Sequence, residues 1–456
     1  MRNFRRSYRT REPRKKISLK KVILLVLPLA VAAVVWLWLV KFESGKPEVS
    51  LLKETHYIEP ELGFRAEDAR SGLAEVRVDV FQDQIEFPIF QEKYPGETYS
   101  VEKRLSMRPL PSGLEEGEAL LRITARDRSW NGGNRTVLER NVTIDTRPPR
   151  PAIMGGPHYI NQGGSGLITV SSNEDTPLVG LEVEDTFFKG FPVTGSRHGV
   201  FYALPPGVPT GTAMRLAAED AAGNRAHLNF SPHIRARQFS RDRIEITDRF
   251  LAQVIPYFRD QDPGLKDTDL EVFIQMNREQ RRQDAEQIRA LCMDTAPQQL
   301  WSGAFLRMPG KTTATFGEER TYFYQGSQID RQTHLGVDLA SLMQSPVPAA
   351  NRGRVVFVGP LGIYGNTVIL DHGCGLFSMY AHLSLIDVEA GAAVEKGDEL
   401  GRTGSTGMAG GDHLHFAMIV QGVFVNPVEW WDPHWIQDNI ELKLEGPKIS
   451  DILSGT

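Results

Sequence analysis

Apolar residues are spread unevenly along this chain, and the longest run of them comes near its start. Residues 22–40 contain no charged side chain. At about 1.5 Å per helical residue, this run approaches the ~30 Å hydrocarbon thickness of a membrane, so we predict a transmembrane anchor. A cleaved signal peptide is the alternative, but its apolar stretch is about 7 to 15 residues long and ends at small residues. Here Trp36, Trp38 and Lys41 stand at that point.

A strand-like pattern follows the apolar run. In residues 74–80 apolar and charged side chains alternate, and residues 179–184 repeat this alternation. A period of two is typical of a strand with one buried face. The motif Ala-x-Asp followed by Asn-Arg also occurs twice, within residues 125–135 and 218–225. The chain therefore contains an internal repeat that is rich in short strands.

The two repeats resemble bacterial immunoglobulin-like domains, whose closing strands often carry such an Ala-x-Asp and Gly-Asn pattern. The resemblance implies two β-sandwiches, over residues 46–147 and 150–236, joined at a proline-rich stretch. We expect them to serve as a spacer. The alternative is that this pair forms an adhesion or assembly module and is itself the main functional part.

The apolar period changes again in the second half of the chain. Residues 243–295 show helical spacing and predict a short helical connector, to which we assign no chemistry. Residues 300–430 return to short apolar runs bracketed by glycine, as a compact, mostly antiparallel sheet with tight turns requires. Residues 431–456 are expected to be a C-terminal tail.

The net charge of −5 conceals an uneven distribution over the 456 residues. Residues 1–21 carry about +9, which leaves about −14 for the rest. Because basic residues flank the cytoplasmic side of a membrane segment, this basic tail is expected in the cytoplasm. We predict a single-pass protein of the cytoplasmic membrane, with its C-terminal domains in the periplasm or extracytoplasmic space. The acidic remainder makes a nucleic-acid partner unexpected.

The chain has only two cysteines, Cys292 and Cys374, which allow at most one disulfide bond. Their spacing is not that of a thiolate zinc site or a redox motif. Whether they pair stays open. Any metal ion must therefore be bound by nitrogen and oxygen atoms.

Histidines gather in the last strand-rich region, which contains five of the 11. The two densest polar motifs there are His334-Leu-Gly-Val-Asp338 and His413-Leu-His415. Because alternate strand residues face the same way, His413 and His415 should project from one surface. Two imidazoles and a carboxylate suit a catalytic Zn²⁺ site, which keeps a fourth position open. The spacing does not tell which of His413 and His415 would bind the metal.

Residues 316–427 resemble the lysostaphin-type zinc endopeptidases of cell-wall metabolism, also called the duplicated hybrid motif family. The matches follow one another in order and include His-Leu-Gly-Val-Asp at 334–338, Tyr-Ala-His-Leu at 380–383, His-Leu-His-Phe at 413–416 and Val-Asn-Pro at 425–427. The resemblance implies a zinc site made of His334, Asp338 and His415. It also implies two catalytic histidines that do not bind the metal, His382 and His413.

Taken together, these patterns predict a mainly β protein. One N-terminal transmembrane helix precedes two immunoglobulin-like β-sandwiches, a short helical connector and a C-terminal antiparallel, barrel-like peptidase domain. His372 is expected at a turn or rim rather than in the metal site. Arg320 follows Phe316-Gly-Glu-Glu, which departs from the family's usual spacing, and a substrate role is therefore not assigned to it.

The function implied by the resemblance is that of a membrane-anchored zinc metalloendopeptidase. It would hydrolyse peptide bonds in peptidoglycan through a zinc-activated water during cell-wall remodelling, with His382 or His413 as the base. The alternative is a non-catalytic regulator or scaffold of cell-wall hydrolases or morphogenesis, although such proteins typically lack some zinc ligands. Cell-wall or morphogenesis proteins are candidate partners. No motif selects the bond that is cut.

Overall fold

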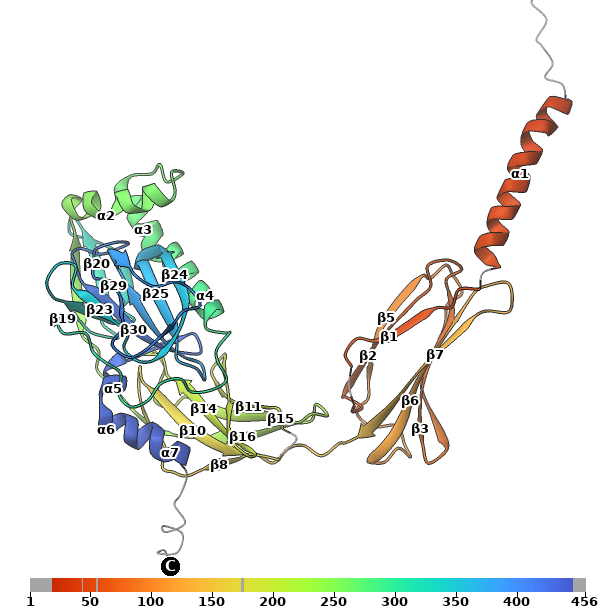
Figure 1. The fold of residues 1–456 in the computed structure, drawn as a ribbon, viewed down its shortest axis with the longest axis horizontal. Helices are drawn as coiled ribbons and strands as arrows, with labels where there is room; N and C mark the ends of the chain where they lie inside the picture. Colours follow the sequence, from red (N-terminus) through yellow and green to blue (C-terminus); the bar gives the residue numbers. More distant parts are fainter. Residues whose placement is uncertain (1–18, 43, 55, 174–175, 446–456) are drawn as a thin grey trace, which may run out of the picture. The chain divides into compact units, whose positions relative to one another are not determined.

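A computed structural model describes residues 19–42, 44–54, 56–173 and 176–445 (Figure 1). Most of the predicted basic tail, residues 1–18, and the last eleven residues, 446–456, lie outside this described part. The chain divides into two compact units. The first comprises residues 1–147 with 222–224, and the second comprises residues 148–221 with 225–456.

The first unit opens with helix α1, Leu19–Lys41, which contains Pro28. Among the described residues, no helix has the combined length and apolar character needed to cross a membrane. The anchor expected at residues 22–40 is therefore not confirmed.

Two antiparallel sheets follow α1, with strand orders β1-β2-β5 and β4-β3-β6-β7. Their strands are β1 (Glu48–Leu51), β2 (Glu61–Glu67), β3 (Leu73–Gln82), β4 (Ile85–Lys93), β5 (Ser100–Ser106), β6 (Gly117–Asp127) and β7 (Arg135–Ile144). Apolar alternation in β3 buries Val76, Val78 and Val80 completely. These valines share one core with Leu62 and Phe64 of β2.

The second unit begins with another pair of antiparallel sheets, in the orders β13-β14-β10-β8 and β12-β11-β15-β16, while β17 pairs with β9. The strands are β8 (Ala152–Met154), β9 (Tyr159–Asn161), β10 (Ser165–Ser171), β11 (Leu178–Val183), β12 (Thr186–Lys189), β13 (Phe191–Thr194), β14 (Arg197–Ala203), β15 (Met214–Glu219), β16 (Arg225–Phe230) and β17 (His233–Arg235). The repeated sequence motif spans the β6–β7 turn and the β15–β16 turn. The immunoglobulin-like character of both β domains stays a prediction.

Helical spacing over residues 243–295 corresponds to strand β18 (Arg241–Ile246) followed by helical segments. These segments are α2 (Asp248–Gln261), α3 (Asp269–Gln275), the π-helical η1 (Met276–Gln280) and α4 (Arg281–Leu291). The side chain of Thr247 caps α2, and Thr268 with Glu271 forms a capping box on α3, which explains why the helices begin there. In Figure 1 these helices, drawn in green, lie against the blue strands that follow.

The last domain is built around a sheet of eight strands in the order β19-β22-β30-β26-β25-β24-β28, with β31 paired to β30. Smaller sheets have the orders β18-β20-β21 and β23-β29-β27. The bounds are β19 (Lys311–Ala314), β20 (Glu319–Tyr324), β21 (Ser327–Thr333), β22 (Val337–Ala340), β23 (Pro346–Pro348), β24 (Gly353–Leu361), η2 (Gly362–Tyr364), β25 (Gly365–Asp371), β26 (Leu376–Ala381), β27 (Leu385–Ile386), β28 (Ala393–Val394), β29 (Glu399–Arg402), β30 (Leu414–Val420) and β31 (Val423–Val425). The mainly β fold predicted from the sequence is confirmed.

The C-terminal segment differs from the expected tail. Residues 427–445 form α5 (Pro427–Trp431), α6 (Pro433–Ile436), η3 (Gln437–Glu441) and α7 (Leu442–Glu445). Ile436 and Ile440 are buried in the core of the second unit, so most of the predicted tail 431–456 that is described is folded. Within this unit, the buried carboxylate of Glu429 on α5 accepts hydrogen bonds from Asn161 Nδ2 at 2.7 Å and from the Ser165 backbone N–H at 3.0 Å.

Candidate metal centre and active site

Neighbouring strands bring the two parts of the predicted ligand set together. Asp338 on β22 is the cross-strand partner of His415 on β30, and such partners point to the same face of a sheet. His334 follows the end of β21 and lies in the segment that connects β21 to β22. Gly336 is required between them, because a Cβ atom there would overlap the His415 ring. The spacing of His-Leu-Gly-Val-Asp thus leaves room for the second histidine.

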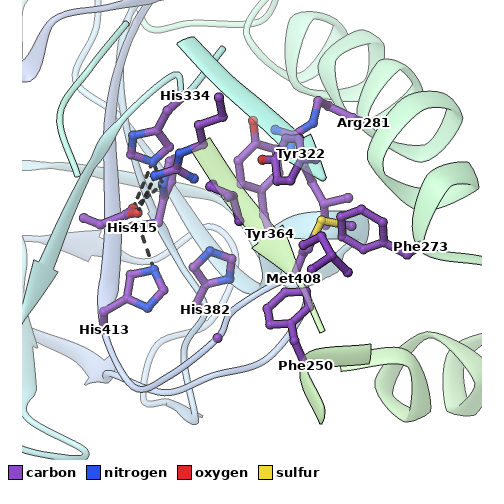
Figure 2. A pocket seen from close by; sticks show the side chains of 16 residues that line it. Phe250, Phe273, Arg281, Tyr322, His334, Tyr364, His382, Met408, His413 and His415 are labelled. Atoms are coloured by element: carbon purple, nitrogen blue, oxygen red, sulfur yellow. Dashed lines mark hydrogen bonds and ion pairs between the residues drawn. The ribbon is translucent and has the colours of Figure 1, made fainter. Parts of the chain in front are cut away.

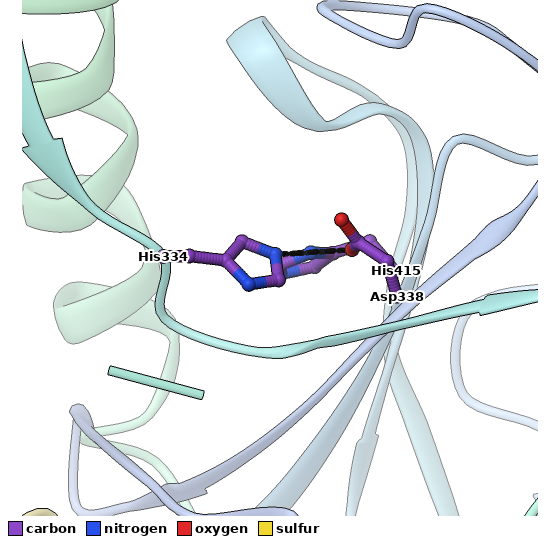
Figure 3. Close-up of side chains that lie close together, drawn as sticks. All are labelled: His334, Asp338 and His415. Carbon is purple, nitrogen blue, oxygen red and sulfur yellow. Dashed lines mark hydrogen bonds and ion pairs between the residues drawn. The ribbon is translucent and has the colours of Figure 1, made fainter. Parts of the chain in front are cut away.

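The three side chains converge on one point (Figure 3). His334 Nε2 lies 3.0 Å from Asp338 Oδ1 and 3.0 Å from His415 Nδ1, and His415 Nδ1 lies 2.9 Å from the same carboxylate oxygen. All three residues are buried. They are the group of histidine and acidic side chains, within the described part of the chain, whose atoms lie close enough together to hold a metal ion.

The donor atoms suit a divalent metal ion. The Nδ1–H of His334 donates to the Thr315 carbonyl at 2.9 Å, so the lone pair of Nε2 points into the group. Burial lowers the pKa of His415 to about 4, against the opposing effect of Asp338, and keeps its ring neutral. Burial alone would raise the pKa of Asp338, but the two imidazoles hold it well below its usual value. Two neutral imidazoles and one carboxylate are the ligands of many catalytic zinc sites.

The two histidines predicted to be catalytic lie next to this group. His382 follows β26 and has a backbone φ of 63°, a strained value for a residue with a side chain. Its Nδ1–H donates to the Thr406 carbonyl at 2.8 Å, and that of His413 donates to the Gly411 carbonyl at 2.8 Å. The two rings are 4.9 Å apart, and His413 Nε2 lies 3.7 Å from Asp338 Oδ1. Burial first, and then the neighbouring histidines, hold the pKa of His382 well below its ordinary value.

All five predicted site residues line a single cavity of about 220 Å³ (Figure 2). These five residues contact the same cavity, although they come from segments up to 81 residues apart in the sequence. A cavity with a candidate metal group, two further imidazoles and an apolar wall has the composition of a hydrolytic active site.

Several lining residues were given no role from the sequence. Arg320 on β20 donates to Asp338 Oδ2 at 3.3 Å and to Glu318 Oε1 at 2.9 Å, so it holds the carboxylate oxygen that the histidines leave free. Phe250, Phe273 and Arg281 come from the helical segments to which no chemistry was assigned, and they line the cavity. No spacing in the sequence signals these residues, because they lie far from the histidine motifs.

His372 lies in the turn that connects β25 to β26, which is one of the two positions predicted for it. It is not at a rim: its side chain is fully buried, with Nδ1 2.7 Å from the Arg352 carbonyl and Nε2 2.7 Å from Ser378 Oγ. Burial lowers its pKa to about 4. It does not belong to the metal group, as expected. Cys292 and Cys374 are both free thiols in the structure.

Comparisons with known proteins agree with this site. Residues 332–427 match the model of peptidase family M23. The DD-carboxypeptidase/endopeptidase Mpg of Neisseria meningitidis is 41% identical over 95 residues, 21% of this chain and 22% of that protein. The peptidoglycan DD-endopeptidase ShyA of Vibrio cholerae is 38% identical over 96 residues, 21% of this chain and 22% of that protein. The chain thus matches about a fifth of the length of these curated relatives.

Among solved structures, the catalytic domain of lysostaphin from Staphylococcus simulans aligns with 27% of this chain and 92% of its own length. It has 28% identity and a TM-score of 0.23. The segment that matches the family model, residues 332–427, contains all five predicted site residues, from His334 to His415. By the family match, residues 332–427 of this chain are similar to peptidase family M23.

Proposed function

We propose that this protein is a zinc metalloendopeptidase that hydrolyses peptide bonds in peptidoglycan. The observation that carries the proposal is the convergence of His334, Asp338 and His415 beside two further imidazoles in one cavity. The names of the relatives, a DD-carboxypeptidase/endopeptidase and a peptidoglycan DD-endopeptidase, support the same reaction. A non-catalytic scaffold would not need a complete donor set of this kind.

In the proposed hydrolysis, three side chains bind the metal ion and two histidines transfer protons. A Zn²⁺ ion held by His334, Asp338 and His415 would make a water molecule more acidic and polarise the carbonyl of a bound peptide. His382 and His413 each tie Nδ1–H to a backbone carbonyl, which leaves Nε2 as a proton acceptor. One Nε2 takes the proton from the attacking water, and a protonated imidazole then supplies a proton to the leaving amine.

The proposal is tested by digesting purified peptidoglycan sacculi with the full-length protein in detergent. We expect soluble muropeptides from zinc-loaded protein, loss of release after chelation, and recovery when zinc is added back. The His415→Ala variant should be inactive under all three conditions. The proposal is wrong if zinc-loaded wild-type protein releases no muropeptides.

We also propose that residues 22–40 attach the protein to the cytoplasmic membrane, with the peptidase domain outside the cytoplasm. The uneven charge around this segment supports the proposal, as do the exposed apolar side chains of α1, such as Leu24, Val31 and Trp36. Fractionation after alkaline washing checks the attachment. Recovery of full-length protein in the washed supernatant would contradict it.

A further inference from the structure

The cavity has two walls of different origin. Strands of the peptidase domain provide the metal group, whereas β18 and the helices α2 to α4 provide the opposite wall, and these lie outside the matched residues 332–427. Arg281, the first residue of α4, belongs to that second wall. Figure 2 draws Arg281 across the pocket from His334 and His413, with Tyr322 and Tyr364 between them. A cation therefore lines the same cavity as the proposed reaction centre.

The buried carboxylate of Asp284 attracts the guanidinium of Arg281, but the two side chains do not form an ion pair. Its Nε and Nη2 donate to the backbone oxygen and the side-chain Oδ1 of Asn277, at 3.3 and 2.8 Å. Within the described part of the chain, no acidic side chain forms an ion pair with it. The other arginine of the cavity, Arg320, differs in this respect, because it is paired with both Glu318 and Asp338. Arg281 therefore keeps guanidinium donors for a ligand.

A buried network fixes this guanidinium in place. Asn277 is fully buried, and its Nδ2 donates to Asp330 Oδ2 at 2.7 Å. Arg278 binds the other oxygen of Asp330 at 3.0 Å. Asn277 and Arg278 lie in the π-helical η1, a rare distortion that is frequent at functional sites. The distortion and its hydrogen bonds hold Arg281 at the cavity wall before any substrate arrives.

We propose that Arg281 binds a carboxylate of the peptide substrate next to the bond that is cut. The inference rests on the proposed peptidase function and adds a substrate class: peptides with a free carboxylate near the scissile bond, rather than neutral glycine bridges. A guanidinium is suited to this task because its planar donors match a carboxylate. Apolar neighbours in the cavity, among them Phe250, Phe273 and Met408, strengthen the interaction by excluding water.

Two cross-linked stem peptides test the inference. They differ only at the group next to the scissile bond, which is a carboxylate in one peptide and a carboxamide in the other. For the full-length zinc-loaded protein we expect kcat/KM to favour the carboxylate peptide by about tenfold or more, as a charge-assisted hydrogen bond allows. Arg281→Gln should bring the ratio close to one, and Arg281→Lys should keep part of it. Arg282→Gln is the matched control: this neighbour faces solvent, pairs with Glu279 and Glu286, and should leave the ratio unchanged.

Equilibrium binding of the same two peptides to the His413→Ala variant separates this inference from the proposed function. If the wild type cleaves neither peptide, the proposed function fails, and the binding ratio still decides the role of Arg281. Equal binding of both peptides, or an unchanged preference in the Arg281→Gln background, would overturn the inference.

Discussion

At the scale of single residues, the two carboxylate oxygens of Asp338 have different partners in the candidate metal site. One oxygen faces the two imidazoles, and the other accepts a hydrogen bond from Arg320. Groups that bind the far side of a metal ligand orient it and tune its affinity. Arg320 is therefore a positioning residue for the carboxylate.

We predict that Arg320→Gln weakens zinc binding by about 10- to 100-fold, the usual effect of removing such a partner. Competition with a chelating dye measures this change directly. The control is Arg331→Gln, since Arg331 is exposed and its side chain donates a hydrogen bond to Gln328 rather than to a candidate metal ligand. Equal zinc affinity of the Arg320 variant and the wild type would contradict the role assigned to Arg320.

The buried His372 should make the protein sensitive to acid. Its folded-state pKa of about 4 lies below the ordinary value of 6.5, so between these values the unfolded chain binds the extra proton. The contribution of neutral His372 to the stability of the folded protein is complete above pH 6.5. It is lost as the pH falls towards 4, at about 1.4 kcal/mol per pH unit. Between pH 7 and pH 5 the free energy of unfolding of the wild type should fall by about 2 kcal/mol more than that of the His372→Gln variant.

Denaturant titrations at both pH values, with zinc present throughout, provide that measurement. The variant also loses the hydrogen bonds to Arg352 and Ser378 and will be less stable at every pH. The pH dependence, not the absolute stability, is therefore the test. An identical pH dependence in both proteins would show that His372 does not titrate on unfolding.

At the scale of elements, α4 shapes the turn that carries Tyr364. The buried carboxylate of Asp284 on α4 accepts a hydrogen bond from the Ile363 backbone N–H at 2.8 Å. Gly362 has a φ of 37°, and a Cβ atom there would overlap this carboxylate. A helix outside the family-matched segment thus fixes a loop of the active-site wall.

Gly362→Ala should destabilise the protein by about 1–3 kcal/mol or more, because backbone strain adds to the displacement of Asp284. Gly391→Ala serves as the control, since Gly391 also has a positive φ, of 90°, but open space around its Cβ position. Thermal unfolding of both variants isolates the contact with Asp284. The interpretation fails if the two substitutions lower the melting temperature equally.

The sequence revealed the elements whose signals are local. His334 and Asp338 share one short motif, His413 and His415 share another, and strand pairing then brings the motifs together. The wall formed by α2 to α4 could not be predicted, because its contacts join residues far apart in the sequence. Helical spacing predicted helices in this region, but not that the half-buried Phe250 and the buried Phe273 would line the candidate active site.

At the scale of the whole molecule, the two β domains differ in their relation to the peptidase domain. Residues 148–221 belong to the same compact unit as the peptidase domain, whereas residues 46–147 belong to the other unit. Glu429 is one reason, because its carboxylate binds Asn161 and Ser165 of the second β domain. A spacer role therefore suits the first β domain better than the second.

Glu429→Ala should destabilise the second unit by about 1–3 kcal/mol for each buried donor left without a partner. Glu441→Ala is a suitable control, since Glu441 also lies near the C-terminus but is exposed. Thermal unfolding combined with limited proteolysis follows the effect, with cleavage between the second β domain and the peptidase domain as the specific sign. Equal resistance of both variants would argue against the coupling.

The composite wall of the cavity bears on how this protein could be shortened or transplanted. A fragment cut to residues 332–427 would keep every proposed zinc ligand and both additional histidines, yet it would lack the helical side that carries Arg281. Such an excised domain would lack one wall of the cavity. Grafting it into a chimaeric lysin would thus transfer the proposed zinc ligands without the side chain that we propose to bind a substrate carboxylate.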